Sequence, residues 1–166
     1  MTNSFSNLLL GRPDLGHVER QRAAEAEFPS LIEKSHMRMW RLGEEWSPAG
    51  EQVIWIGVGT FSVYDMELLD KLEAKLSRET VKELIYVSDT VAFPEFNFEE
   101  RLPGIGRVFD VPIVGYWKEG VLEVKLSSAK ARDWLMERFE LPPLSSIQRF
   151  QRQSRGGISD HIRGEH

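Results

Sequence analysis

The stretch FDVPIVGYWKEGVLEVKL, residues 109–126, decides the fold of this chain. An apolar run begins at Pro112 and breaks at Lys118-Glu119-Gly120, and a second apolar run follows. Two apolar runs separated by a short turn that contains glycine predict an antiparallel β-hairpin. Proline cannot donate a main-chain hydrogen bond, so it is tolerated at the start of a strand, where the sheet can spare one donor. We therefore expect paired strands over 111–117 and 121–126.

The residues that precede the hairpin predict two more strands and a helix. Val53–Val58 is a short β-branched run typical of a strand buried on both faces, and Leu84–Val87 is a second strand. Between them, residues 66–76 form an amphipathic helix with one apolar stripe. A right-handed crossover makes these two strands parallel neighbours. After the hairpin, a serine at 127 or 128 begins a last helix that runs to about residue 139.

The fold class that follows is α/β, with a mixed sheet of about four strands. Two strands are parallel, the hairpin adds an antiparallel pair, and helices flank the sheet. We divide the chain into residues 1–51, an N-terminal arm and helices packed on the core; 52–141, the core; and 142–166, a flexible C-terminal tail. Residues 17–42 have helical spacing, which Pro29 splits into two helices or one kinked helix. A short helix is expected over 98–102.

Composition excludes several classes of chemistry. The 166 residues contain no cysteine, which rules out disulfides, thiolate metal sites and thiol catalysis by this chain. The four histidines are scattered, so we expect no metal site. The net charge of −5 argues against non-specific nucleic-acid binding. No apolar run is long enough for a membrane span, and we expect a cytoplasmic protein.

The hairpin and the segment that begins at residue 53 resemble the thioredoxin superfamily over residues 52–140. In that family a proline with a cis peptide bond begins a core strand, and a lysine-polar-glycine turn leads to the next; VPIVGYWKEGVLEVKL has this layout. The resemblance implies a cis Val111–Pro112 bond. It also places Gly59-Thr60-Phe61-Ser62 where redox-active members carry Cys-x-x-Cys. The chain is similar to a cysteine-free, non-redox member, because disulfide exchange requires a thiolate.

The resemblance further implies where a partner binds. In this family the groove between the motif loop and the cis-proline loop holds extended polypeptide. The residues expected to line it are Gly59, Thr60, Phe61, Ser62, Val111 and Pro112. We therefore expect a protein that binds another protein or peptide, as an adaptor, a chaperone-like protein or an assembly factor. No catalytic residue and no cofactor are expected, and the oligomeric state stays open, with a homodimer among the options.

Two other classes of function stay open. Gly57-x-Gly59-x-x-Ser62 follows a strand and precedes a helix, and Asp89 ends the next strand, which echoes the dinucleotide-binding fingerprint. That pattern points to a small-molecule or nucleotide-binding α/β enzyme that uses the 57–62 loop. The second alternative is a structural subunit that forms oligomers through its N-terminal helices and tail. Asp65, at the start of the helix, is interpreted as a favourable charge on the helix dipole.

Overall fold

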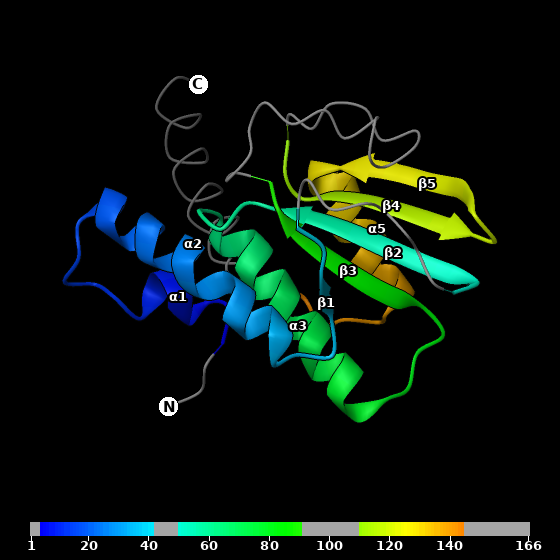
Figure 1. Cartoon of the computed structure of the whole chain (residues 1–166), viewed down its shortest axis with the longest axis horizontal. Coiled ribbons are helices and arrows are strands. Elements are labelled where there is room, and N and C mark those ends of the chain that lie inside the picture. Colours follow the sequence, from blue (N-terminus) through cyan, green and yellow to red (C-terminus); the bar gives the residue numbers. More distant parts are fainter. Residues whose placement is uncertain (1–3, 42–49, 91–109, 145–166) are drawn as a thin grey trace, which may run out of the picture.

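The computed structural model describes residues 4–41, 50–90 and 110–144. Within these ranges the chain forms four labelled helices and five strands (Figure 1). The helices are α1 (Asn7–Leu10), α2 (His17–Glu33), α3 (Val63–Arg78) and α5 (Ser128–Arg138). The strands are β1 (Arg38–Met39), β2 (Gln52–Val58), β3 (Leu84–Asp89), β4 (Ile113–Lys118) and β5 (Val121–Ser127). None of the helices in these parts of the chain is long and apolar enough to cross a membrane.

The strands form one mixed sheet in the order β1-β3-β2-β4-β5 (Figure 1). β1 and β2 both pair with β3 in parallel, whereas β4 is antiparallel to both β2 and β5. The predicted fold class is confirmed, including the parallel pair and the antiparallel hairpin. β1 is a fifth strand that the sequence pattern did not predict.

The hairpin has the turn chemistry that its sequence indicates. Glu119 and Gly120 lie between β4 and β5 with φ of 51° and 83°, and two successive residues at positive φ characterise the tight turns of hairpins. The Val111–Pro112 peptide bond is cis, as the resemblance implies. The pairing of β4 with β5 shifts by one residue between Tyr116 and Trp117, which marks a bulge.

The core lies mainly on one face of the sheet. β2 is buried along almost its whole length, as expected for a central strand. Ile54, Ile56 and Val58 on this strand belong to a cluster that also takes residues from all four helices. On the opposite face Trp55 is fully buried and donates its indole N–H to Ser88 Oγ at 2.9 Å.

The N-terminal region differs from the prediction. α2 is one helix that contains Pro29 and ends at Glu33, well before residue 42. The hydroxyl group of Ser35 donates to the Ile32 carbonyl oxygen at 2.6 Å and accepts the Met37 N–H at 3.0 Å. A serine that competes for the last helical carbonyls favours a turn over a further helical turn. The chain after it can therefore extend and pair as β1.

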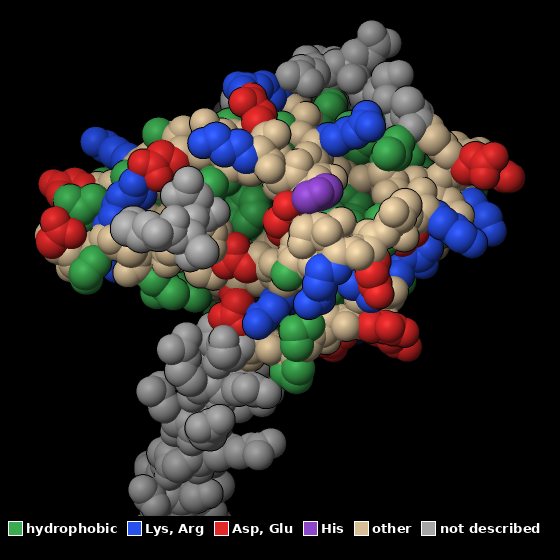
Figure 2. Space-filling view, turned by 90° about the horizontal axis from the view of Figure 1, so that it is seen from below, with side chains coloured by type: hydrophobic (Ala, Val, Ile, Leu, Met, Phe, Trp, Pro, Cys, Tyr) green, Lys and Arg blue, Asp and Glu red, His purple; other side chains and the backbone are tan. Residues whose placement is uncertain are grey.

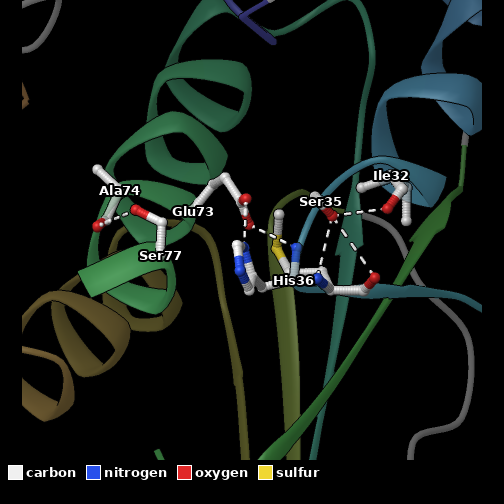
Figure 3. Close-up of polar contacts among 7 residues, drawn as sticks. Ile32, Ser35, His36, Glu73, Ala74 and Ser77 are labelled. Carbon is white, nitrogen blue, oxygen red and sulfur yellow. Dashed lines mark hydrogen bonds and ion pairs between the residues drawn. The ribbon is translucent and has the colours of Figure 1, made fainter. Parts of the chain in front are cut away.

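Two carboxylates on α3 hold the N-terminal region. Asp70 accepts the main-chain N–H groups of Phe5 at 2.7 Å and Ser6 at 3.0 Å, and it also accepts the Ser6 hydroxyl. Glu73 accepts the His36 N–H at 2.8 Å and contacts its Nδ1 at 2.8 Å (Figure 3). The segment before α1 and the turn after α2 are therefore both attached to the same helix.

The remaining predicted elements have mixed outcomes. Leu144, beyond the last helix, is buried in the core, while residues 145–166 lie outside the described residues. The helix expected over 98–102 also lies outside them.

On the face seen in Figure 2, acidic and basic side chains are interspersed, and no large area carries a single sign of charge.

Candidate functional site

The sheet brings the two predicted loops to the same edge, which is formed by the end of β2 and the start of β4. β2 and β4 are antiparallel neighbours, and Gly57 near the end of β2 is paired with Ile113 at the start of β4. The residues that follow β2 and those that precede β4 therefore leave the sheet side by side. We call residues 59–62 and 111–112 together the loop pair. The predicted site residues are thus brought together from segments about fifty positions apart.

Gly57 is required by packing at this edge. A Cβ atom at this position would lie 2.7 Å from Ile113 Cγ2 and 2.8 Å from both Thr90 Cγ2 and Trp55 Cη2. Three side chains already fill the space that a methyl group would need. The glycine therefore serves close packing around β2, which accounts for it without a bound phosphate.

The loop of residues 59–62 is closed by its own hydrogen bonds. The Ser62 N–H donates to the Gly59 carbonyl oxygen at 2.9 Å, and Ser62 Oγ caps α3 by accepting the Asp65 N–H at 3.3 Å. The Gly59 N–H donates to Asp65 Oδ2 at 2.9 Å. A phosphate-binding loop needs free N–H groups at the helix start, and here two of them already have partners.

Asp89 has a different partner from the one that the dinucleotide pattern requires. It ends β3, and its Oδ2 accepts the hydroxyl of Thr60 at 3.3 Å. Thr60 is fully buried and Asp89 nearly so. This contact attaches the loop to β3 and gives the acidic side chain a structural role.

The six predicted site residues differ in exposure. Phe61 is 49% exposed, and its ring lies over Gly59, where a Cβ atom would be 2.5 Å from Phe61 Cε1. Ser62 and Val111 are partly exposed. The other three, Gly59, Thr60 and Pro112, are buried. A partner at the loop pair would thus touch mainly Phe61 and Val111, and the buried residues would set the shape of the loops.

The start of α5 is attached to the proline loop. The Ser128 N–H donates to the Pro112 carbonyl oxygen at 2.8 Å, and Ser128 itself has φ of 56°. One turn further along, the guanidinium carbon of Arg132 lies 5.7 Å from the centre of the Tyr64 ring on α3. α5 therefore contacts the proline loop and the first turn of α3, which follows residues 59–62.

Asp65 is the residue at this edge whose importance the sequence analysis missed. Its side chain has no exposed surface, and its Oδ1 has no hydrogen-bond partner. Burial raises the pKa of the Asp65 carboxyl group to about 6, against the opposing effects of the Gly59 N–H, Arg132 and Ser62. A signal was available, because Asp65 precedes Leu68, Leu69 and Leu72 by three, four and seven positions, on the buried face of the helix.

The described residues offer no group of side chains suited to a metal ion. Within residues 4–41, 50–90 and 110–144, no three histidine, aspartate or glutamate side chains are placed to hold a metal ion. Ser62 is occupied as a helix cap, and no histidine adjoins it in the sequence. The site can offer an apolar surface, partly exposed polar groups and a buried carboxyl group.

Comparisons with known proteins give little beyond this description. No family model matches the chain, and no curated protein matches it. Among solved structures, the chain is similar to a chain in the crystal structure of ERdj5 form II, at 10% sequence identity and a TM-score of 0.44. The match covers 71% of this chain and 15% of that one, so this chain spans a small part of its neighbour's length. The strand order and the antiparallel hairpin have the layout that the resemblance to the thioredoxin superfamily implies.

Proposed function

We propose that this chain is a non-redox, thioredoxin-like binding protein that holds a segment of another protein at the loop pair. The observation that carries the proposal is the half-exposed ring of Phe61 at the edge where the two loops meet. A large aromatic side chain that is only partly covered is a common anchor of protein interfaces. The partly exposed Val111 lies in the other segment of the loop pair. The complementary surface we propose is therefore an apolar side chain on an extended segment.

Chemistry supports binding over catalysis. The chain has no cysteine, so it has no thiolate nucleophile. An insulin-reduction assay on the pure protein is expected to show background rates only, and turnover above background would contradict a purely non-redox role. Two features count against the nucleotide-binding alternative: the Gly59 N–H is bonded to Asp65, and the Asp89 carboxylate is bonded to Thr60.

The proposal can be tested by comparing proteins retained from a native lysate by immobilised wild type and variants. Phe61→Ala removes the proposed anchor, and Gly59→Ala displaces its ring because the new methyl group would occupy the same space. Val121→Ala is the matched control, since Val121 is 64% exposed but lies at the hairpin turn. We expect a partner that binds wild type and Val121→Ala about tenfold or more tightly than either loop variant.

Equal retention by Phe61→Ala would contradict the proposed site. The structural-subunit alternative is separated by light scattering on purified protein. A stable oligomer that persists in Phe61→Ala and retains no partner would favour that alternative. The cytoplasmic location stays a prediction, which fractionation of cells expressing the tagged chain would test.

A further inference from the structure

Asp65 lies beneath the loop that carries Phe61 and is bonded to it at two points. Its Oδ2 accepts the Gly59 N–H at 2.9 Å, and its own N–H donates to Ser62 Oγ at 3.3 Å. These are the first and last residues of the loop that carries the proposed anchor. The second carboxyl oxygen, Oδ1, is buried and has no hydrogen-bond partner. In the closed loop, therefore, only one of the two carboxyl oxygens accepts a hydrogen bond.

The charged groups around Asp65 do not supply the hydrogen-bond donor that Oδ1 of an ionised carboxylate would need. Arg132 on α5 is the basic group whose charge acts on Asp65, and this guanidinium also lies over the Tyr64 ring. On the β3 side, the acidic Asp89 is bonded to Thr60 of the same loop. A buried carboxylate without donors on both oxygens is costly, whereas a neutral carboxylic acid is much less so.

We propose that Asp65 is a pH-dependent clamp on residues 59–62, which holds the loop closed when its carboxyl group is protonated and lets the loop open when it ionises. Opening admits water to Oδ1 and breaks the Gly59 N–H bond, so the ring of Phe61 loses its fixed position. The loop itself carries the proposal, and no bound partner is required. Any effect on partner binding rests in addition on the function proposed above.

Linkage sets the direction and the size of the effect. An open loop exposes Asp65 to water and restores its ordinary pKa of 3.8, whereas burial in the closed loop raises the pKa to about 6. The ratio of closed to open forms is therefore highest below the lower value and falls as the pH rises through the upper one. The difference between the two pKa values corresponds to a change in this ratio on the order of a hundredfold.

Backbone amide hydrogen exchange followed by NMR on the full chain tests the clamp. We expect the protection factor of the Gly59 amide, corrected for the intrinsic dependence of exchange on pH, to fall about tenfold between about pH 5 and pH 7.5. The Trp40 amide, which donates to the Val87 carbonyl oxygen in the sheet, is the internal reference and should fall much less. In Asp65→Asn, the side-chain amide can still accept the Gly59 N–H but cannot ionise, so protection should not change with pH.

Asp133→Asn is the matched variant, because it removes an exposed carboxylate on α5 and should behave as wild type. A Gly59 protection factor that is equal at both pH values in wild type would overturn the proposal. So would a fall of the same size in Asp65→Asn. Should that variant not fold, the carboxyl ¹³C shift of Asp65 in wild type decides, since its midpoint must coincide with the loss of Gly59 protection. These measurements use no partner, so their failure is distinct from failure of the proposed function.

Discussion

At Asp65 two opposing effects act on one carboxyl group. The Gly59 N–H and Arg132 favour the charged form, while burial disfavours it and is the larger effect. The folded state therefore keeps the Asp65 proton up to a higher pH than the unfolded state does. A group of this kind stabilises the fold fully below its ordinary pKa, and that contribution is lost as the pH rises through the folded-state value.

The stability of the protein should carry this signature. Between about pH 4 and pH 7, ionisation of Asp65 should lower the free energy of unfolding by up to about 3 kcal/mol, and opening of the loop would reduce this loss. Urea unfolding of wild type and Asp65→Asn across this range gives the measurement. The difference between the two proteins should grow in favour of Asp65→Asn as the pH rises. A difference that is constant with pH would contradict the prediction.

Gly57 offers a second prediction at the scale of one residue. Gly57→Ala places a methyl group within 2.8 Å of three side chains, so their packing must shift. We expect a loss of about 1–3 kcal/mol in the free energy of unfolding. Gly16→Ala is the comparison, because its nearest neighbour would be 3.9 Å away. Gly16 is the N-cap of α2, so its replacement should cost at most about 1 kcal/mol, through the cap and without a packing clash. Equal thermal midpoints for the two variants would show that the edge of the sheet is loosely packed.

Among the elements, α3 connects the site to the N-terminal region. It begins at the Ser62 cap of the loop pair, and along its length Asp70 binds the segment before α1. Glu73 binds the turn after α2, as Figure 3 shows. The amphipathic pattern of the sequence places Glu67 and Asp70 on the outward face of this helix. Glu67 is in fact 8% exposed. The helix is therefore in contact with the rest of the protein over a wider part of its surface than the apolar stripe alone.

Asp70→Asn tests the attachment of the N-terminal segment. The variant keeps an acceptor oxygen for one of the two main-chain donors, but it loses the charge and turns an amide N–H₂ toward the other donor. We expect the free energy of unfolding to fall by about 1–3 kcal/mol and limited proteolysis near Phe5 to accelerate. Ser77→Ala on the same helix is the control, since its hydroxyl bonds only to the carbonyl oxygen of Ala74. Unchanged proteolysis would mean that the buried side chains alone hold the segment.

Prediction from sequence succeeded where an apolar pattern repeats several times along a helix or strand. The hairpin, β2, α3 and β3 each have an unbroken apolar pattern, so their type and order could be predicted. β1 pairs over two residues, Arg38 and Met39, which is too short for an alternation to appear. The end of α2 depends on one hydroxyl, that of Ser35, competing for a carbonyl.

The site was predictable in part for the same reason. The antiparallel pairing of β2 and β4 follows from the element order, and it brings Gly59 and Val111 together. Which of the site residues are exposed depends on side-chain packing, such as the ring of Phe61 over Gly59, and the sequence does not contain that information. Asp65 was missed because a carboxylate in a first helical turn has an ordinary explanation, and its place on the buried face was not weighed against it.

Over the whole molecule, the N-terminal helices and the sheet share one core. Phe28 on α2 is fully buried and belongs to the same cluster as Ile54 on β2 and Leu135 on α5. A shared core implies that α2 and the sheet unfold together, although they lie on either side of the predicted boundary at residue 51.

Phe28→Ala tests whether α2 and the sheet unfold together. The variant should lose about 3–5 kcal/mol in the free energy of unfolding. Tryptophan fluorescence reports on all five tryptophans, of which Trp55 and Trp117 lie in the sheet and none lies in α2. Fluorescence and far-ultraviolet circular dichroism should give coincident transitions in wild type and variant. Val18→Ala, on the exposed side of α2, should change stability little, since Val18 is 58% exposed. Two separated transitions, with only the helical signal shifted, would show that the N-terminal region is an independent unit.

The two edges of the sheet differ in a way that bears on how the folded molecule behaves at high concentration. β1 offers only two residues to an incoming strand, while β5 offers seven, and no strand in the described parts of the chain pairs with its outer side. Unsatisfied main-chain groups along such an edge are where intermolecular β-aggregation begins. The bulge opposite Tyr116 and Trp117, together with the exposed charges of Glu123 and Lys125, makes β5 a poor template. Of the two edge strands that the structure describes, β5 is therefore the one where these protective features matter more.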